Sequence, residues 1–82
     1  MRCAVLGAGG WGTACSRLLA LGGHDTILWA RDPMRVEAIR RDRQNVKYLP
    51  EIELPLDRLG LTSDLSEAVH RDVLFLGVDP RR

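Results

Sequence analysis

The sequence predicts an α/β fold built around a parallel four-stranded sheet, and three observations lead to that prediction. Short apolar runs of strand length alternate with helical patterns along the chain, and a glycine-rich turn separates the first run from the first helix. Strands joined by helices pair in parallel through right-handed crossovers. With 82 residues, 45% of them hydrophobic, the chain suffices for one such unit and is too short for two ordinary domains.

The first strand and the first helix have distinct patterns. Residues 2–6 form a mostly apolar run, which is typical of a buried parallel strand. From Trp11 onward, apolar residues recur at the spacing of one helical face, which predicts a helix packed on the sheet through that stripe. Gly22-Gly23 predicts the end of this helix, because glycine readily adopts the left-handed conformation. The stripe consists of Trp11, Ala14, Cys15, Leu18 and Leu19.

The second strand is expected at 26–29, where β-branched and aromatic residues suit a sheet. Asp32-Pro33 predicts the start of a second helix, with Asp32 as the N-cap and Pro33 at the first helical position. A long connection, interrupted by prolines, then follows at 43–58. Long loops in compact domains are often functional or mobile, so this segment is a candidate for function.

The last part of the chain predicts two more strands. A short strand is expected at 59–62, and Ser63 or Asp64 then caps a short helix that continues through Val69. The last strand is expected at 73–78, where the chain is continuously apolar apart from one glycine. Right-handed crossovers between these elements give the strand order 3-2-1-4.

The glycine-rich turn carries the strongest chemical signal in the sequence. Residues 7–12 read Gly-Ala-Gly-Gly-Trp-Gly, directly between a predicted strand and a predicted helix. In this context the pattern predicts a dinucleotide site in the first part of a Rossmann fold. Gly7 permits the tight turn, Gly9 lets a pyrophosphate approach the backbone, and Gly12 lets the helix lie close to the strand. The alternative is a glycine turn selected only for close packing.

The expected cofactor is NADP or NAD. The backbone N–H groups of Gly10 and Trp11 are expected to face its phosphates, aided by the helix dipole. Sites that prefer NAD usually carry an acidic residue at the end of the second strand, whereas this chain has Arg31 there. A guanidinium at that point pairs with a 2′-phosphate or stacks on adenine, which favours NADP or dual use. The alternative for Arg31 is a solvated surface charge, and Asp32 is better explained as the helix cap.

Taken together, these motifs resemble those of a known family, the bacterial NAD(P)-dependent glycerol-3-phosphate dehydrogenases. The resemblance rests on Trp-Gly-Thr at 11–13, Trp-Ala-Arg-Asp-Pro at 29–33 and Asn-Val-Lys-Tyr-Leu-Pro at 45–50. It extends from Met1 to about Val78. It implies an oxidoreductase that interconverts sn-glycerol 3-phosphate and dihydroxyacetone phosphate, which supplies glycerophospholipid synthesis.

The resemblance also implies which residues contact the dinucleotide, namely Gly10, Trp11, Arg31 and Tyr48. At the position of Gly10 the family more often has serine, so only the backbone N–H is left to bind at this point of the chain. Tyr48 lies in the long connection at 43–58 and gives that segment a reason for its length. An equally good interpretation of Tyr48 is that its ring packs the connection down.

The chain departs from the family pattern after the last predicted strand. The family continues with Val-Pro and a small polar residue, whereas here Val78 is followed by Asp79-Pro80-Arg81-Arg82. By resemblance, the catalytic lysine and the helical substrate domain are expected beyond residue 82. We therefore expect residues 1–82 to be the N-terminal portion of a dinucleotide-binding domain, with the substrate domain absent. No catalytic residue is predicted, since Lys47 matches the cofactor side and His24 and His70 lie at element edges.

Composition and charge exclude several other classes. Twelve basic and eleven acidic residues give a net charge of +1, which provides no footprint for nucleic acid. No apolar run is long enough to insert into a membrane, and the first one is too short for a signal peptide, so a cytoplasmic protein is expected. Cys3 and Cys15 lack metal-ligand spacing and are expected to be reduced and buried, and no metal site is predicted.

Three other functions are compatible with the same residues. The chain can be a standalone, non-catalytic dinucleotide-binding module, a flavin-binding N-terminus, or a truncated fragment without a competent site. Flavin sites normally keep an acidic residue where Trp29 to Arg31 stands, which disfavours that alternative. In each case the last strand, 73–78, forms a flat apolar edge that is expected to pair with another chain, so self-association is predicted.

Overall fold

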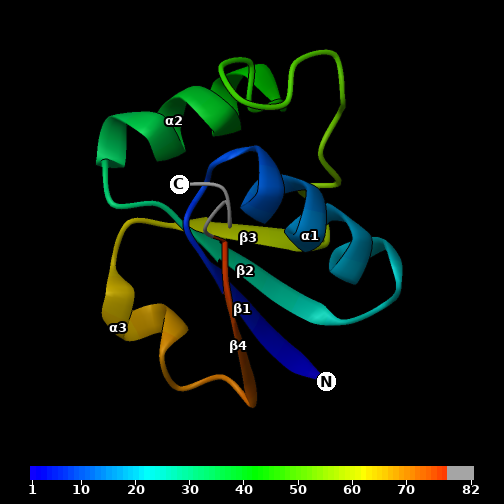
Figure 1. Cartoon of the computed structure of the whole chain (residues 1–82), viewed down its shortest axis with the longest axis vertical. Coiled ribbons are helices and arrows are strands. Elements are labelled where there is room, and N and C mark those ends of the chain that lie inside the picture. Colours follow the sequence, from blue (N-terminus) through cyan, green and yellow to red (C-terminus); the bar gives the residue numbers. More distant parts are fainter. Residues whose placement is uncertain (78–82) are drawn as a thin grey trace.

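A computed structural model describes residues 1–77 and confirms the predicted α/β architecture. In these residues four strands form a parallel sheet of order β3-β2-β1-β4, as Figure 1 shows. The strands are β1 (Arg2–Leu6), β2 (Asp25–Trp29), β3 (Leu59–Thr62) and β4 (Val73–Leu76). The helices are α1 (Gly10–Leu21), α2 (Pro33–Asp42) and α3 (Leu65–Ala68). The end of the last predicted strand, Val78, lies outside the described residues.

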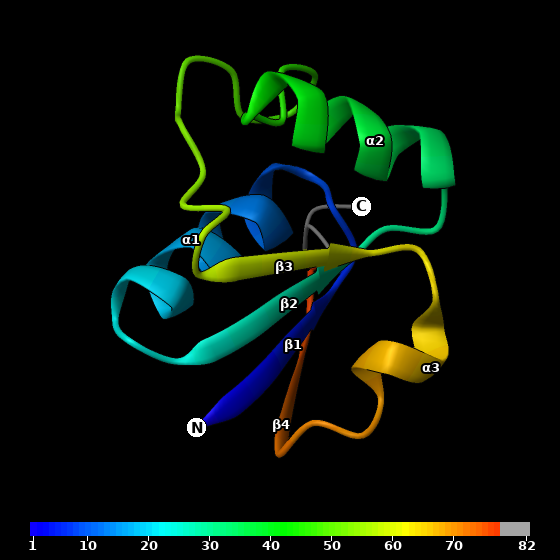
Figure 2. The ribbon, with the colours of Figure 1, turned by 180° about the vertical axis from the view of Figure 1, so that it is seen from behind.

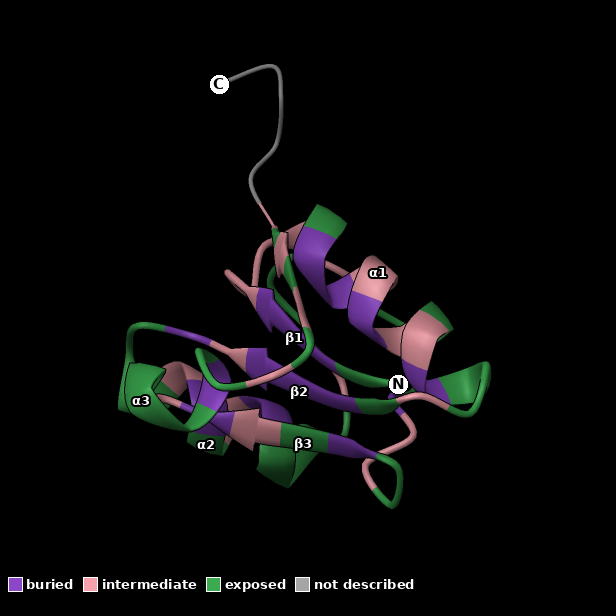
Figure 3. Cartoon of the chain, turned by 90° about the horizontal axis from the view of Figure 1, so that it is seen from below, coloured by how far each residue is buried: buried purple, intermediate pink, exposed green. Residues whose placement is uncertain are grey.

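The helices cover the two faces of the sheet in separate layers, as the views in Figures 1 and 2 show. One face packs against α1, α2 and the connection at 43–58, and the opposite face packs against α3. Neighbouring residues of β1 therefore belong to different clusters, Val5 to the first and Ala4 to the second. The first cluster contains Val5, Ala20, Leu28, Ile39, Leu54 and Leu59. Figure 3 shows the buried positions concentrated in β1, β2 and one side of α1.

The apolar stripe predicted to pack α1 on the sheet does so only in part, and the prediction is wrong for Trp11 and Leu18. Trp11 is 61% exposed and Leu18 is 66% exposed, while Cys15 and Leu19 pack only at the margin of the core. The buried side of α1 is made of small residues: Gly12, Thr13, Ser16 and Ala20. Because α1 approaches β1 closely at its first turn, only small side chains fit between them, and the large ones are displaced outward.

The predicted helix caps are confirmed with small changes. The carboxylate of Asp32 accepts a hydrogen bond from the Met34 N–H at 2.9 Å, and Pro33 occupies the first turn of α2. Asp64, rather than Ser63, caps α3, which ends at Ala68. Of the two glycines after α1, only Gly23 has a positive φ, +91°, so the left-handed stop comes from the second glycine alone. Local sequence thus places the helix starts well and their ends to within a residue.

Candidate functional site

The glycine turn follows β1 at the carboxyl edge of the parallel sheet. Gly7 has a φ of +116°, a conformation that favours glycine, and its N–H donates to the Trp29 carbonyl at 2.9 Å. The chain therefore turns away from β1 directly beside the end of β2. This confirms the turn predicted for Gly7 and brings the turn next to the segment that carries Arg31.

Gly12 lets α1 lie against the turn, as the sequence predicts. A Cβ atom at Gly12 would lie 2.0 Å from the Gly7 carbonyl oxygen, a distance that no real contact tolerates. Gly77, directly after β4, packs into the same place, since a Cβ there would lie 2.5 Å from that oxygen. The sequence placed Gly77 within the last strand, but β4 ends at Leu76, so Gly77 is a packing position that was not predicted. Two glycines of the turn and one from a distant part of the chain, Gly77, thus bring β1, α1 and β4 together.

Gly9 differs from these glycines because packing does not require it to lack a side chain. Within residues 1–77, and apart from Gly9 and its two chain neighbours, no heavy atom lies within 4 Å of a Cβ built at Gly9, and its φ of −78° is open to other residues. Gly9 is the N-cap of α1, and no side chain caps the helix there. The N–H groups of the first turn lack intrahelical partners by helix geometry, and open space lies beside the residue that precedes them. This arrangement suits an anion at the start of α1.

The connection between α2 and β3 folds over the glycine turn, as Figures 1 and 2 show. Asn45 is 1% exposed, and its Nδ2 donates to the Ala8 carbonyl and to the Thr13 hydroxyl, both at 2.8 Å. Neither Asn45 nor Thr13 was predicted to have this role. The only signal was that Asn45 begins the Asn-Val-Lys-Tyr-Leu-Pro segment. A polar loop residue is usually exposed, and nothing local marks one that is buried against a turn 37 positions away.

Tyr48 lies beside the start of α1. A Cβ at Gly10 would lie 2.9 Å from the Tyr48 carbonyl oxygen, so the glycine at position 10 permits a contact that a serine would obstruct. The Tyr48 side chain is 45% exposed. The Arg35 guanidinium lies 4.7 Å from the centre of its ring, and the Lys47 ammonium lies 5.2 Å from it. Arg35 first and Lys47 second stabilise the phenolate and lower the pKa of Tyr48.

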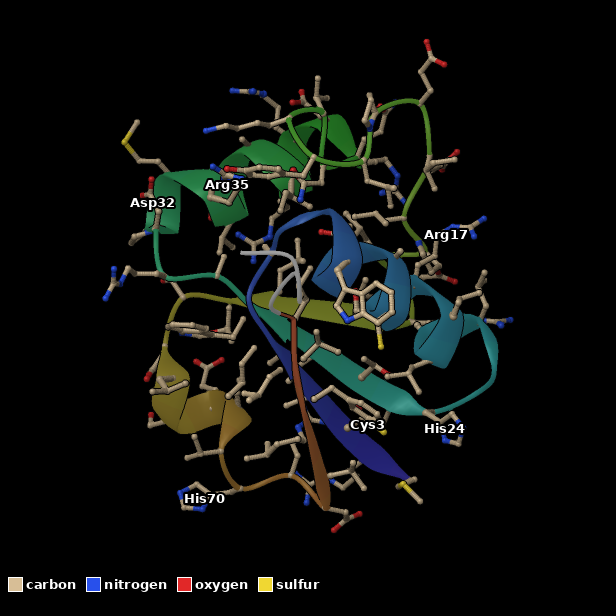
Figure 4. All side chains as sticks on the ribbon, in the orientation of Figure 1. Cys3, Arg17, His24, Asp32, Arg35 and His70 are labelled. Atoms are coloured by element: carbon tan, nitrogen blue, oxygen red, sulfur yellow. The ribbon has the colours of Figure 1, made fainter. Side chains whose placement is uncertain are left out.

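Positive charge therefore gathers at the carboxyl edge of the sheet. Arg31 is exposed and follows β2 directly, and Figure 4 shows Arg35 projecting from the start of α2 near Asp32. Within residues 1–77, no carboxylate lies within 4.0 Å of Arg31, Arg35 or Lys47. The structure thus brings Gly7, Gly9, Gly10, Trp11, Gly12 and Tyr48 to one place. Arg31 lies at the same edge of the sheet, just after β2.

Other reactive side chains lie away from this edge. Figure 4 places His24 and His70 at the opposite end of the molecule from Arg35. In the described part of the chain, no three His, Cys, Asp or Glu residues are grouped to hold a metal ion, and no helix is long and apolar enough to cross a membrane. Cys3 is buried and Cys15 only half-buried, which corrects the prediction for Cys15, and both are free thiols. Burial first and Cys3 second raise the pKa of Cys15.

Together these features define a class of protein. A parallel sheet of order 3-2-1-4, with a glycine turn leading from its first strand into a helix N-terminus, is the dinucleotide-binding unit of Rossmann-type enzymes. The family described as NAD-dependent glycerol-3-phosphate dehydrogenase N-terminus matches residues 2–81. The chain belongs to this family, which confirms the resemblance seen in its motifs.

Proteins similar to this chain are named glycerol-3-phosphate dehydrogenases. A glycerol-3-phosphate dehydrogenase (NAD(P)+) of Stenotrophomonas maltophilia strain R551-3 is 53% identical over 77 residues, which cover 94% of this chain and 22% of that protein. One of Xanthomonas campestris pv. campestris strain B100 is 53% identical over 66 residues, or 80% of this chain and 19% of that protein. The crystal structure of glycerol-3-phosphate dehydrogenase from Coxiella burnetii superposes with a TM-score of 0.80 at 31% identity, covering 92% of this chain and 23% of that one. The chain thus spans about a fifth of the length of these relatives.

Proposed function

We propose that this chain binds NADP or NAD at the glycine turn. We further propose that it is the cofactor-binding part of an oxidoreductase that interconverts sn-glycerol 3-phosphate and dihydroxyacetone phosphate for glycerophospholipid synthesis. The observation that supports this best is the open space at Gly9, beside the N–H groups at the start of α1 that have no intrahelical partner. A glycine at a position where no packing requires it suggests that a ligand approaches the backbone at that point.

Each predicted site residue has a part in this proposal. The backbone at Gly9 admits the pyrophosphate, and the N–H groups of Gly10 and Trp11 donate to it. Gly7 and Gly12 shape the turn that presents those groups. Arg31 pairs with the 2′-phosphate of NADP, and Tyr48 borders the site from the connection. When bound, the nicotinamide supplies the hydride acceptor or donor, and the proposal assigns no catalytic residue to the described part of the chain.

The wider setting of the chain follows from this proposal. We infer that residues 1–82 are the N-terminal portion of a dinucleotide-binding domain, because the matching relatives are several times longer. We infer a cytoplasmic location, because NADP and NAD are held inside cells. We also infer that copies of the chain associate through β4, where Leu74 is 44% exposed and Leu76 is 70% exposed.

Titration calorimetry with NADP, NAD and FAD tests the cofactor proposal. We expect NADP to bind more tightly than NAD, and Arg31→Ala to weaken NADP binding about tenfold while leaving NAD binding unchanged, since a charge-assisted hydrogen bond contributes about 1.5–3 kcal/mol. Arg58→Ala is the matched control, because Arg58 lines a hollow with His24 and Asp25 at the opposite edge of the sheet.

Three results would contradict the proposal. Equal loss of NADP and NAD binding in Arg31→Ala would show that Arg31 does not read the 2′-phosphate. Tighter binding of FAD would favour the flavin alternative, and no binding of any dinucleotide would favour a fragment without a competent site. The 82-residue chain alone is expected not to oxidise glycerol 3-phosphate, and measurable turnover would show that its own residues include a catalytic group.

A further inference from the structure

One buried side chain holds the connection over the glycine turn. The Nδ2 of Asn45 donates to the Ala8 carbonyl, inside the turn, and to the hydroxyl of Thr13, which lies on the buried side of α1. The Asn45 carbonyl in turn accepts from the N–H groups of Tyr48 and Leu49, at 3.2 and 2.7 Å. The same residue therefore anchors the connection to the glycine turn and closes the tight turn that carries Tyr48.

The place where Asn45 holds Tyr48 suits an anion. The Tyr48 backbone lies against Gly10, the first residue of α1, and its ring is flanked by the cations of Arg35 and Lys47. Within residues 1–77, no carboxylate within 4.0 Å neutralises either cation. Two cations, a phenol and the amides at a helix N-terminus together form the kind of surroundings that phosphate groups require.

We propose that Asn45 is a positioning residue of the dinucleotide site, which holds Tyr48 against the first turn of α1 and brings its ring to the cation of Arg35, where the phosphates of the cofactor bind. This inference rests on the proposed function. Asn45 acts through Tyr48, because its donor atoms are already used within the protein. If these two hydrogen bonds of Asn45 are removed, the connection is held only by contacts elsewhere along its length, such as the hydrogen bond from Arg17 Nε to the Glu53 carbonyl.

The position of Tyr48 can be measured without any cofactor. Tyr48 is the single tyrosine of the chain, so an absorbance titration of the phenolate reports on it alone. We expect Asn45→Ala to raise the pKa of Tyr48 towards its ordinary value, because the ring leaves Arg35 on α2, the largest cause of the lowered pKa. Gln44→Ala is the matched control, since Gln44 bonds to the Glu51 N–H on the exposed side of the same connection and should leave the titration unchanged.

A second variant displaces Tyr48 by another route. Gly10→Ala leaves Asn45 intact but puts a Cβ against the Tyr48 carbonyl, so it should raise the pKa of Tyr48 in the same direction. Circular dichroism establishes whether each variant is folded, and if Asn45→Ala is not, Gly10→Ala provides the test. An unchanged Tyr48 titration in the folded variants would overturn the positioning role, whatever the cofactor does.

Calorimetry with NADP then tests the connection to the site. We expect Asn45→Ala to bind NADP about tenfold more weakly than the original chain, as for the loss of one strong hydrogen bond, and Gln44→Ala to bind it equally well. A raised Tyr48 pKa with unchanged NADP affinity would overturn the inference. If the original chain binds no dinucleotide, the proposed function fails, while a raised Tyr48 pKa would still support Asn45 as the residue that positions Tyr48.

Discussion

At the scale of single residues, the absence of a side chain has a different physical reason at each glycine of the turn. Gly12 faces the backbone of Gly7 so closely that any side chain would force α1 away from β1. Gly9 faces open space, so the absence of a side chain there is explained, in the proposed function, by a ligand that approaches the backbone. A glycine motif is therefore a mixture of packing and binding positions, and substitution separates the two.

Alanine at Gly12 should affect mainly stability, and alanine at Gly9 mainly dinucleotide binding. We expect Gly12→Ala to lower the free energy of unfolding by about 3 kcal/mol or more, because the obstacle is backbone and cannot rotate away. Gly9→Ala should change it by about 1 kcal/mol or less, as for an altered N-cap, yet weaken dinucleotide binding. Urea denaturation and calorimetry measure the two quantities. Equal stability of both variants would contradict the packing role of Gly12.

The position of Tyr48 depends on Gly10, which lies far from it in the sequence but contacts it in the fold. The resemblance to the family left its role open between binding the cofactor and packing the connection. The structure gives its backbone a packing role against Gly10 and leaves its ring half-exposed, with the cations of Arg35 and Lys47 nearby. The packing contact belongs to the backbone of Tyr48, and a binding role for its ring stays a proposal.

At the scale of elements, α1 shows where a periodic pattern misleads. Its large apolar residues recur at helical spacing, but the side that packs is determined by how near the helix lies to the sheet. Gly12 sets that distance, and the neighbouring buried positions then take small residues such as Ser16 and Ala20. Trp11 and Leu18 are left on the surface. The hydrophobic pattern carries no information about the distance between α1 and the sheet, so it could not predict which side of α1 is buried.

The start of α2 allows a test of an element on its own. Asp32→Ala removes the acceptor for the Met34 N–H and should lower the free energy of unfolding by about 1 kcal/mol. Asp32→Asn is the control, because asparagine caps a helix about as well as aspartate does. Urea denaturation measures both variants. If Asp32→Asn is as destabilised as Asp32→Ala, the capping bond is not what Asp32 contributes.

At the scale of the whole molecule, the sheet is covered unevenly. β1 and β2 lie between strands and carry most of the buried core, whereas β4 pairs with β1 on one side and leaves Leu74 and Leu76 exposed. A strand edge with apolar side chains is a ready template for another strand. This is the basis for the proposed association of copies through β4.

Self-association should respond to charge on that strand. We expect the average mass in light scattering to rise with protein concentration for the original chain, and Leu76→Lys to reduce the rise, because a lysine on an edge strand opposes pairing. Leu18→Lys is the control, since Leu18 is 66% exposed but lies on α1. A monomer at all concentrations, or an equal effect of both lysines, would contradict association through β4.

The sequence by itself determined the order of the strands, the glycine turn and the helix starts. These follow from local patterns and from the handedness of crossovers, so the roles of residues such as Gly7 and Asp32 can be assigned from their immediate neighbours in the chain. Tertiary structure alone decided which side of α1 is buried, why Asn45 is buried, and how Tyr48 comes to lie on Gly10. The contacts of Asn45 and Tyr48 join residues more than thirty positions apart, and pairings at such separation leave no periodic trace in the chain.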